Sequence, residues 1–151
     1  MEMRIGKEFK FESAHQLVGH EGNCAHLHGH SYRLIVEVYG PLVGEGSSEG
    51  MVYDYADLSE VVKSVVIDRM DHAFLAEGNE PCLGALIDSG SKVYHLGMRT
   101  TAENLSIHIW GLLCEAFAFK GFSGGISKVR VMETALTYAE INAEDDSGIH
   151  F

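Results

Sequence analysis

A cysteine and three histidines gather in one short stretch of the chain, Cys24-Ala-His-Leu-His-Gly-His-Ser-Tyr32. His26, His28 and His30 occupy alternate positions, and side chains two residues apart in a β-strand point to the same face. A strand that starts near His28 would therefore place two imidazoles on one face, about 7 Å apart along the chain. Imidazole is the commonest metal-ligating side chain, and zinc accepts it readily. Although a lone histidine is usually an ordinary surface or core residue, this spacing predicts a metal site.

Two further polar side chains occupy positions where a strand should be apolar. His15 ends the apolar parity of an alternating segment over residues 3–15, which predicts a half-buried strand. If this strand pairs antiparallel with the one that begins at His28, His15 comes close to the other two imidazoles. Glu133 falls on the apolar parity of a later strand, where a carboxylate needs a partner or a ligand. Three histidines that leave a fourth position open are typical of a catalytic zinc site, in which the metal polarises substrate oxygens.

The thiol of Cys24 and the pair Asp71–His72 leave alternatives open. A thiol near the metal could be a fourth ligand that closes a structural site, or a thiolate that serves as base or nucleophile. His72, oriented by a carboxylate such as Asp71 or Glu133, would suit the activation of that thiol. Alternatively, Asp71 and His72 simply cap the end of a helix. His26 is either a ligand or a residue that faces the loop.

The elements that must position these groups follow the order ββααββ. Alternation and helical spacing predict strands over residues 3–15, 28–43, 126–135 and 138–143, and helices over residues 54–70 and 101–117. Asp54 and Thr101 are the expected N-caps of the two helices. Residues 73–99 are expected to be irregular, and residues 144–148 disordered. We therefore expect one α+β domain over residues 1–151, with a four-stranded antiparallel sheet and two helices on one face.

The composition excludes several classes of partner and location. A formal net charge of −11 argues against nucleic acid as the main partner, because phosphate backbones require clustered lysine and arginine. No apolar run reaches the roughly 18 residues that a transmembrane helix needs. Residues 1–8 lack the apolar core of a signal peptide, and three cysteines do not form a disulfide framework. The expected location is the cytoplasm.

Six segments, taken together and in order, resemble the 6-pyruvoyltetrahydropterin synthase / 6-carboxytetrahydropterin synthase family. The matching segments are Phe11–His15, Cys24–Tyr32, Gly50–Leu58, Met70–Leu75, Thr101–Leu105 and Val131–Thr134. Each segment alone is a weak signal, but all six in this order are highly specific and run nearly from end to end of the chain. The resemblance implies the tunnelling fold, in which sheets from several subunits join into a barrel. It also implies active sites between subunits and a homohexamer, a dimer of trimers.

The resemblance assigns a role to each polar residue singled out above. The implied site comprises the zinc ligands His15, His28 and His30, the catalytic proton acceptor Cys24, its relay partners Asp71 and His72, and Glu133, Thr101 and Glu103 around the pterin. Glu133 would anchor the pterin ring through its N–H and amino groups, and it is sometimes grouped with the relay. Cys24 would not be a metal ligand.

The implied substrate is 7,8-dihydroneopterin triphosphate, for which the family has two outcomes. One product is 6-pyruvoyltetrahydropterin, formed with loss of triphosphate only. The other is 6-carboxytetrahydropterin, formed with release of acetaldehyde and triphosphate on the way to queuosine and other deazapurines. The short spacing Cys-x-x-x-His-Gly-His at residues 24–30 resembles the carboxy-forming bacterial enzymes. The lyase that cleaves a carbon–carbon bond is therefore favoured.

Two other functions compete with the lyase hypothesis, and one segment of the chain departs from the family. A non-catalytic module could use Cys24 to close a Cys-His₃ zinc site, and a related epimerase or aldolase would not need the histidine triad. The segment 76–100 is longer than its counterpart in compact members of the family. Its length leaves the triphosphate site open, with Lys10, Lys92 and Arg99 as candidate contacts.

Overall fold

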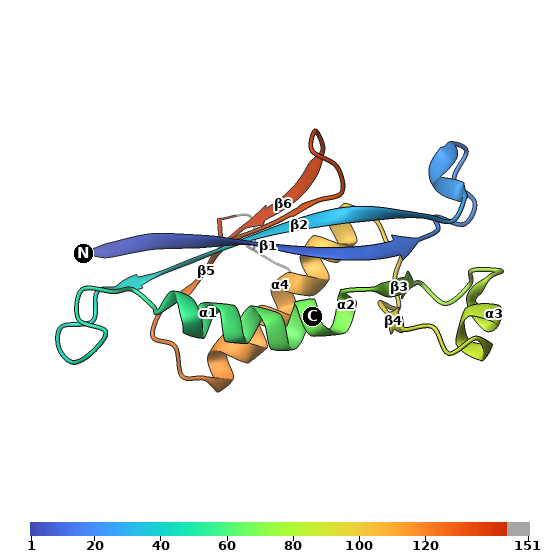
Figure 1. The fold of residues 1–151 in the computed structure, drawn as a ribbon. Helices are drawn as coiled ribbons and strands as arrows, with labels where there is room; N and C mark the ends of the chain where they lie inside the picture. Colours follow the sequence, from blue (N-terminus) through green and yellow to red (C-terminus); the bar gives the residue numbers. More distant parts are fainter. Residues whose placement is uncertain (145–151) are drawn as a thin grey trace.

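A long antiparallel pair of strands forms the centre of the molecule (Figure 1). The computed structural model describes residues 1–144. β1 (Glu2–His15) and β2 (His28–Pro41) pair along their whole length, from Glu2 opposite Pro41 to His15 opposite His28. Phe11 and Tyr32 face each other in this ladder and stack in the core. The two predicted strands and their antiparallel pairing are confirmed.

The complete sheet has six strands in the order β4-β3-β1-β2-β5-β6. β5 (Gly125–Met132) and β6 (Tyr138–Asn142) extend the antiparallel part, so the four predicted strands are all present. β3 (Ala73–Ala76) and β4 (Val93–His95) add two short parallel strands beside β1. The prediction that residues 73–99 are irregular is therefore wrong. Every residue of β3 is buried, so the alternation that reveals a half-buried strand is missing from its sequence.

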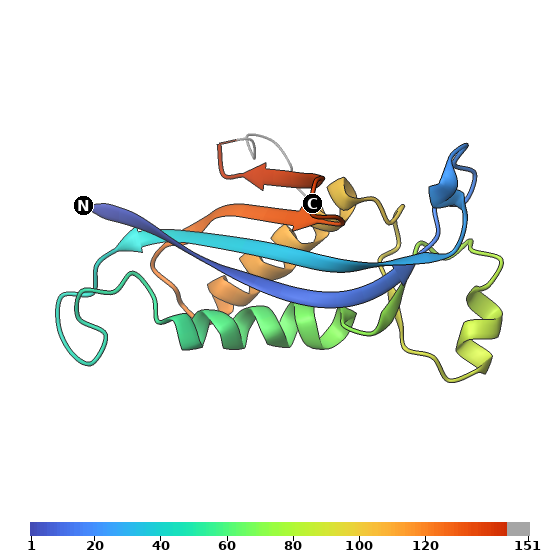
Figure 2. The same cartoon turned by 45° about the horizontal axis from the view of Figure 1, so that its top comes forward.

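The two long helical segments cover one face of the sheet (Figure 2). The first runs through α1 (Tyr55–Val62), a π-helical turn η2 (Lys63–Ile67) and α2 (Asp68–Met70), and the second is α4 (Ala102–Phe119). The side chains of Asp54 and Thr101 accept hydrogen bonds from the backbone N–H groups of Ala56 and Asn104, which confirms both predicted N-caps. The apolar core lies between these helices and the sheet. No helix in residues 1–144 is long and apolar enough to cross a membrane.

Two connecting segments lie at the end of the β1–β2 pair that carries His15 and His28 (Figure 1). One is the loop over residues 16–27, which contains a single 3-10 turn, η1 (Asn23–Ala25). The other is the segment between β3 and β4, which contains the short helix α3 (Leu83–Asp88). The N-terminus lies at the opposite end of the molecule. Of the tail predicted to be disordered, residues 145–148 lie outside the described residues.

Candidate active site

The pairing of β1 with β2 brings three imidazoles together. His15 lies opposite His28, and Ser13 lies opposite His30, so all three rings project from the same face of the sheet. The Nε2 atom of His15 lies 3.0 Å from Nε2 of His28 and 3.2 Å from Nε2 of His30. The ligand atoms of the three residues all lie within 4.8 Å of one another. The structure therefore forms the three-histidine cluster that strand periodicity and pairing predicted.

Backbone carbonyls orient two of these rings for metal binding. Nδ1 of His15 lies 2.7 Å from the carbonyl oxygen of Thr100, and Nδ1 of His28 lies 2.6 Å from that of His26. Because a carbonyl only accepts, Nδ1 carries the proton and the lone pair of Nε2 is free for a metal. Nitrogens bound to one tetrahedral zinc lie about 3.3 Å apart, which is close to the spacing in the cluster. The residues present fit a divalent metal ion.

Burial favours the neutral form, which ligates metals, in two of the three imidazoles, His15 and His30. The pKa of His15 is lowered to about 4, mainly by burial and to a smaller extent by the charges of His28 and His30, while the hydrogen bond to Thr100 acts in the opposite direction. Burial also lowers the pKa of His30, with a smaller contribution from His28. His26 contributes its backbone oxygen to Nδ1 of His28, and its side chain is not part of the donor cluster.

We expect the free energy of unfolding of the metal-free protein to fall as the pH is lowered from 6.5 to about 4. In this interval the unfolded chain protonates His15 at its ordinary pKa of 6.5, whereas the folded chain resists protonation until about pH 4. Protons then bind preferentially to the unfolded state, which lowers stability. Urea unfolding of chelator-treated protein at several pH values measures the effect. His15→Gln should weaken the dependence, and an unchanged slope in that variant would contradict a buried neutral imidazole.

A carboxylate lies beside the cluster. Glu133 directly follows β5, so the strand ends earlier than the predicted residue 135, and its Oε1 lies 3.9 Å from Nε2 of His15. Burial raises the pKa of Glu133, the charge of Glu103 raises it further, and His28 lowers it. Glu103 lies in the first turn of α4, two residues after the cap residue Thr101. The two acidic side chains thus come from different elements and influence each other beside the cluster, where they can accept hydrogen bonds from N–H groups of a ligand.

Cys24 occupies the loop over residues 16–27, next to the cluster in sequence but outside it. Its thiol is half-buried, and no cysteine of residues 1–144 belongs to the donor cluster. The backbone N–H of Leu17 donates to the Cys24 carbonyl at 2.9 Å, and Nε2 of Gln16 donates to the Ala25 carbonyl at 2.8 Å. Gln16 also accepts a hydrogen bond from the Cys82 thiol. The loop is thus anchored through the backbone carbonyls of Cys24 and Ala25, while the catalytic role of Cys24 stays a prediction.

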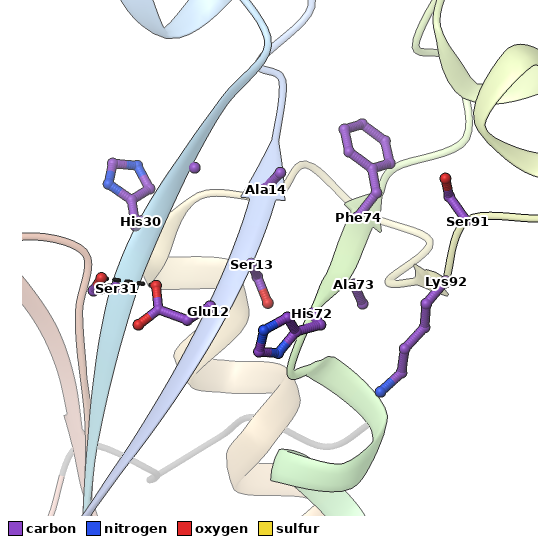
Figure 3. A pocket seen from close by; sticks show the side chains of 11 residues that line it. Glu12, Ser13, Ala14, His30, Ser31, His72, Ala73, Phe74, Ser91 and Lys92 are labelled. Carbon is purple, nitrogen blue, oxygen red and sulfur yellow. Dashed lines mark hydrogen bonds between the residues drawn. The ribbon is translucent and has the colours of Figure 1, made fainter. Parts of the chain in front are cut away.

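The structure places Asp71 and His72 in a separate, exposed position. Oδ2 of Asp71 lies 2.9 Å from Nδ1 of His72, and Oδ1 of Asp71 accepts from the backbone N–H of Glu12 at 2.8 Å. His72 lines a cavity of about 550 Å³ together with Glu12, Ser31 and Lys92 (Figure 3). The side chains of Glu12 and Ser31 alternate with those of the cluster face, so they lie on the other face of the sheet. Within one chain, His72 does not join the imidazole cluster.

Sequence reasoning missed the backbone groups that shape the site. The carbonyls of Thr100 and His26 orient two imidazoles, but any residue type supplies a carbonyl, so no pattern marks them. The conformation of His72 was also missed, because it has a φ of 57° and is the one non-glycine residue in residues 1–144 with a positive φ. Such conformations persist where the surroundings impose them, and they cluster at functional sites.

Known proteins resemble this chain over nearly its whole length. The family model described as 6-pyruvoyl tetrahydropterin synthase matches residues 4–144. A protein of Haemophilus influenzae named 6-carboxy-5,6,7,8-tetrahydropterin synthase is 38% identical over 141 residues, which cover 91% of this chain and 96% of that protein. A Synechocystis protein of the same name is 35% identical over 137 residues, which cover 89% of each chain.

Solved structures support the same fold. An uncharacterised protein of Wolinella succinogenes superposes with a TM-score of 0.77 at 22% identity, over 95% of this chain and 99% of that one. The 6-pyruvoyl tetrahydropterin synthase of Plasmodium vivax superposes with a TM-score of 0.72 at 20% identity, over 93% and 97% of the two chains. At this identity the structures establish the tunnelling fold, and the family model and the closer relatives add the sequence evidence. The chain belongs to the 6-pyruvoyl tetrahydropterin synthase family.

Proposed function

We propose that this protein is a zinc-dependent 6-carboxytetrahydropterin synthase, a lyase that acts on 7,8-dihydroneopterin triphosphate. One water is consumed, acetaldehyde and triphosphate leave, and the first side-chain carbon becomes the carboxylate of 6-carboxy-5,6,7,8-tetrahydropterin. The reaction needs no external reductant, because the oxidation of that carbon balances the reduction of the dihydropterin ring. The relatives from Haemophilus influenzae and Synechocystis carry this name. The observation that carries the proposal is the convergence of three Nε2 atoms beside the half-buried carboxylate of Glu133.

Each group in the proposed site has a distinct task. A zinc ion held by His15, His28 and His30 would polarise the hydroxyl oxygens of the substrate side chain and acidify the neighbouring C–H bonds. Cys24, which is half-buried, takes up the proton from such a carbon as the thiolate and returns it as the thiol. Glu133 accepts hydrogen bonds from the ring N–H and amino group of the pterin, with Thr101 and Glu103 lining the same pocket. These contacts fix the ring, so that the side chain extends toward the imidazoles.

We propose that Asp71 and His72 complete the site of a neighbouring copy of the chain. The side chain of His72 is 78% exposed, whereas that of His15 is 2% exposed, and His72 does not belong to the imidazole cluster of its own chain. β4 and β6 are the edge strands of the sheet, and pairing of such edges between copies into a barrel would satisfy their free backbone groups. A dimer of trimers is the assembly that the family leads us to propose. Asp71 would then orient His72 toward the thiol of the neighbouring chain.

We further propose that residues 1–151 form one domain that acts in the cytoplasm in queuosine biosynthesis. A small, anionic pterin would be its substrate, and the net charge of −11 disfavours nucleic acid. None of the three cysteines forms a disulfide in the structure, in keeping with a reducing compartment.

The test of this function is product analysis with the zinc-loaded protein. After incubation with 7,8-dihydroneopterin triphosphate, acetaldehyde and triphosphate should appear in equal amounts together with 6-carboxytetrahydropterin. Absence of turnover would refute the proposal. Release of triphosphate without acetaldehyde would instead establish the alternative, a 6-pyruvoyltetrahydropterin synthase.

A further inference from the structure

The turn that carries Asp71 and His72 is held by a lysine from a distant part of the chain. Lys92 directly precedes β4, and its Nζ donates to the carbonyl oxygens of Asp68 at 2.7 Å and Asp71 at 2.8 Å. These carbonyls lie at the C-terminal end of the first helical segment, where they lack helical partners and a positive charge is favourable. The Lys92 carbonyl in turn accepts from the backbone N–H of Phe74 at 2.9 Å. Lys92 thus contacts the turn on both its N-terminal and its C-terminal side.

This turn needs such external support because its backbone is strained. His72 has a φ of 57°, a left-handed conformation that is unfavourable for a non-glycine residue. On one side, Glu12 fixes the turn, because its carbonyl accepts from the His72 N–H at 2.6 Å and its N–H donates to Asp71. On the other side, Lys92 bonds the carbonyl of Asp71, directly before the strained residue. The peptide that sets the direction of the His72 side chain is therefore held from two sides.

The electrostatics of the turn match this arrangement. The N–H of Glu12 lowers the pKa of Asp71 most strongly, His72 and Lys92 lower it further, and desolvation acts in the opposite direction. Asp71 therefore remains ionised and accepts a hydrogen bond from Nδ1 of His72, which leaves Nε2 directed away from the pair. Figure 3 shows Lys92 extending along one wall of the cavity that His72 lines, with the ammonium at the base of the turn.

We propose that Lys92 is a positioning residue for the proton relay: its ammonium fixes the backbone turn that presents the His72 imidazole. The proposal rests on the proposed function for the reaction and for the role of His72 as a relay residue. It differs from the sequence-based expectation that Lys92 contacts the substrate triphosphate, because both hydrogen bonds of the ammonium go to backbone carbonyls of the turn. It also gives the long segment over residues 76–100 a task in the site.

The test replaces Lys92 by methionine, which keeps the aliphatic stem and removes the ammonium. Because a small misplacement of a catalytic group is costly, kcat of K92M should fall by about 10- to 100-fold, with KM and zinc content unchanged. The limb of the pH–rate profile that reports His72 should shift. K92R, which retains N–H donors, should recover most of the rate. K120M is the matched control, because Lys120 contacts Glu60 on the exposed helical surface, and its kcat should stay at the wild-type value.

Two outcomes would overturn the proposal. An unchanged kcat and pH profile with a lower Tm would make Lys92 a helix cap only, and a raised KM with unchanged kcat would make it a phosphate contact. Hydrogen exchange at the His72 N–H provides a readout that does not require turnover. K92M should accelerate this exchange at least about tenfold, and unchanged exchange would overturn the proposal even if the wild-type protein does not act on the pterin. Wild-type inactivity with accelerated exchange would refute only the proposed reaction.

Discussion

Replacing Cys24 by alanine should lower kcat by a factor of about 10²–10⁴ and leave the zinc content unchanged. The loss is expected because the substrate carbon would have no nearby proton acceptor. Zinc should remain because the thiol lies outside the donor cluster of three histidines. The loop should keep its shape, since its anchors use the backbone of Cys24 and Ala25 rather than the thiol. Metal analysis and steady-state kinetics on the same preparation measure both quantities.

Cys82→Ser is the matched control for this experiment. Its hydroxyl retains a donor toward Gln16, so the loop anchor survives while a second thiol is removed. Its turnover should stay near that of the wild type. If Cys24→Ala loses zinc and stability together, the thiol is a ligand and the non-catalytic Cys-His₃ module becomes the better description.

Replacing His28 by alanine should weaken zinc binding by more than about 100-fold. The loss of an outer partner of a ligand alone typically costs 10- to 100-fold, and the loss of the ligand itself should cost more. Zinc should then no longer raise the Tm of the protein, because stabilisation by a ligand depends on its affinity for the folded state. Competition with a chelator and thermal unfolding with and without zinc measure the two effects.

His26→Ala separates the role of a ligand from that of its neighbour. Only the backbone carbonyl of His26 contacts the cluster, through Nδ1 of His28, and the substitution retains that carbonyl. Zinc affinity should therefore stay close to the wild-type value. Equal losses in the two variants would contradict the assignment of His28 as the ligand and of His26 as its backbone support.

The parts of the site that follow from side-chain periodicity could be predicted from the sequence. His15 and His28 end the apolar parities of two strands, and one antiparallel pairing is enough to bring them together. Asp54 and Thr101 are cap residues by type and position, and both cap their helices. In these cases the residue type itself carries the local structural preference.

The parts that depend on tertiary contacts could not be predicted. β3 is buried throughout, so its sequence shows no alternation. Its parallel partner is β1, and the paired residues, such as Ser13 and Ala73, lie 60 positions apart in the chain. The left-handed His72 results from hydrogen bonds to Glu12 and from the contact of Lys92 with Asp71, not from the preference of histidine. The position of the Asp71–His72 pair apart from the imidazole cluster likewise follows from where the first helical segment ends.

The three imidazoles and the Cys24 thiol are carried by different parts of the β1–β2 hairpin. The imidazoles are fixed by a ladder of many residue pairs, whereas Cys24 belongs to the hairpin connection between the two strands. An insertion or deletion near the tip of that connection would relocate the sulfur and leave the three-histidine cluster intact. A change in hairpin length could therefore move the thiol while the three imidazoles keep their places on the strands.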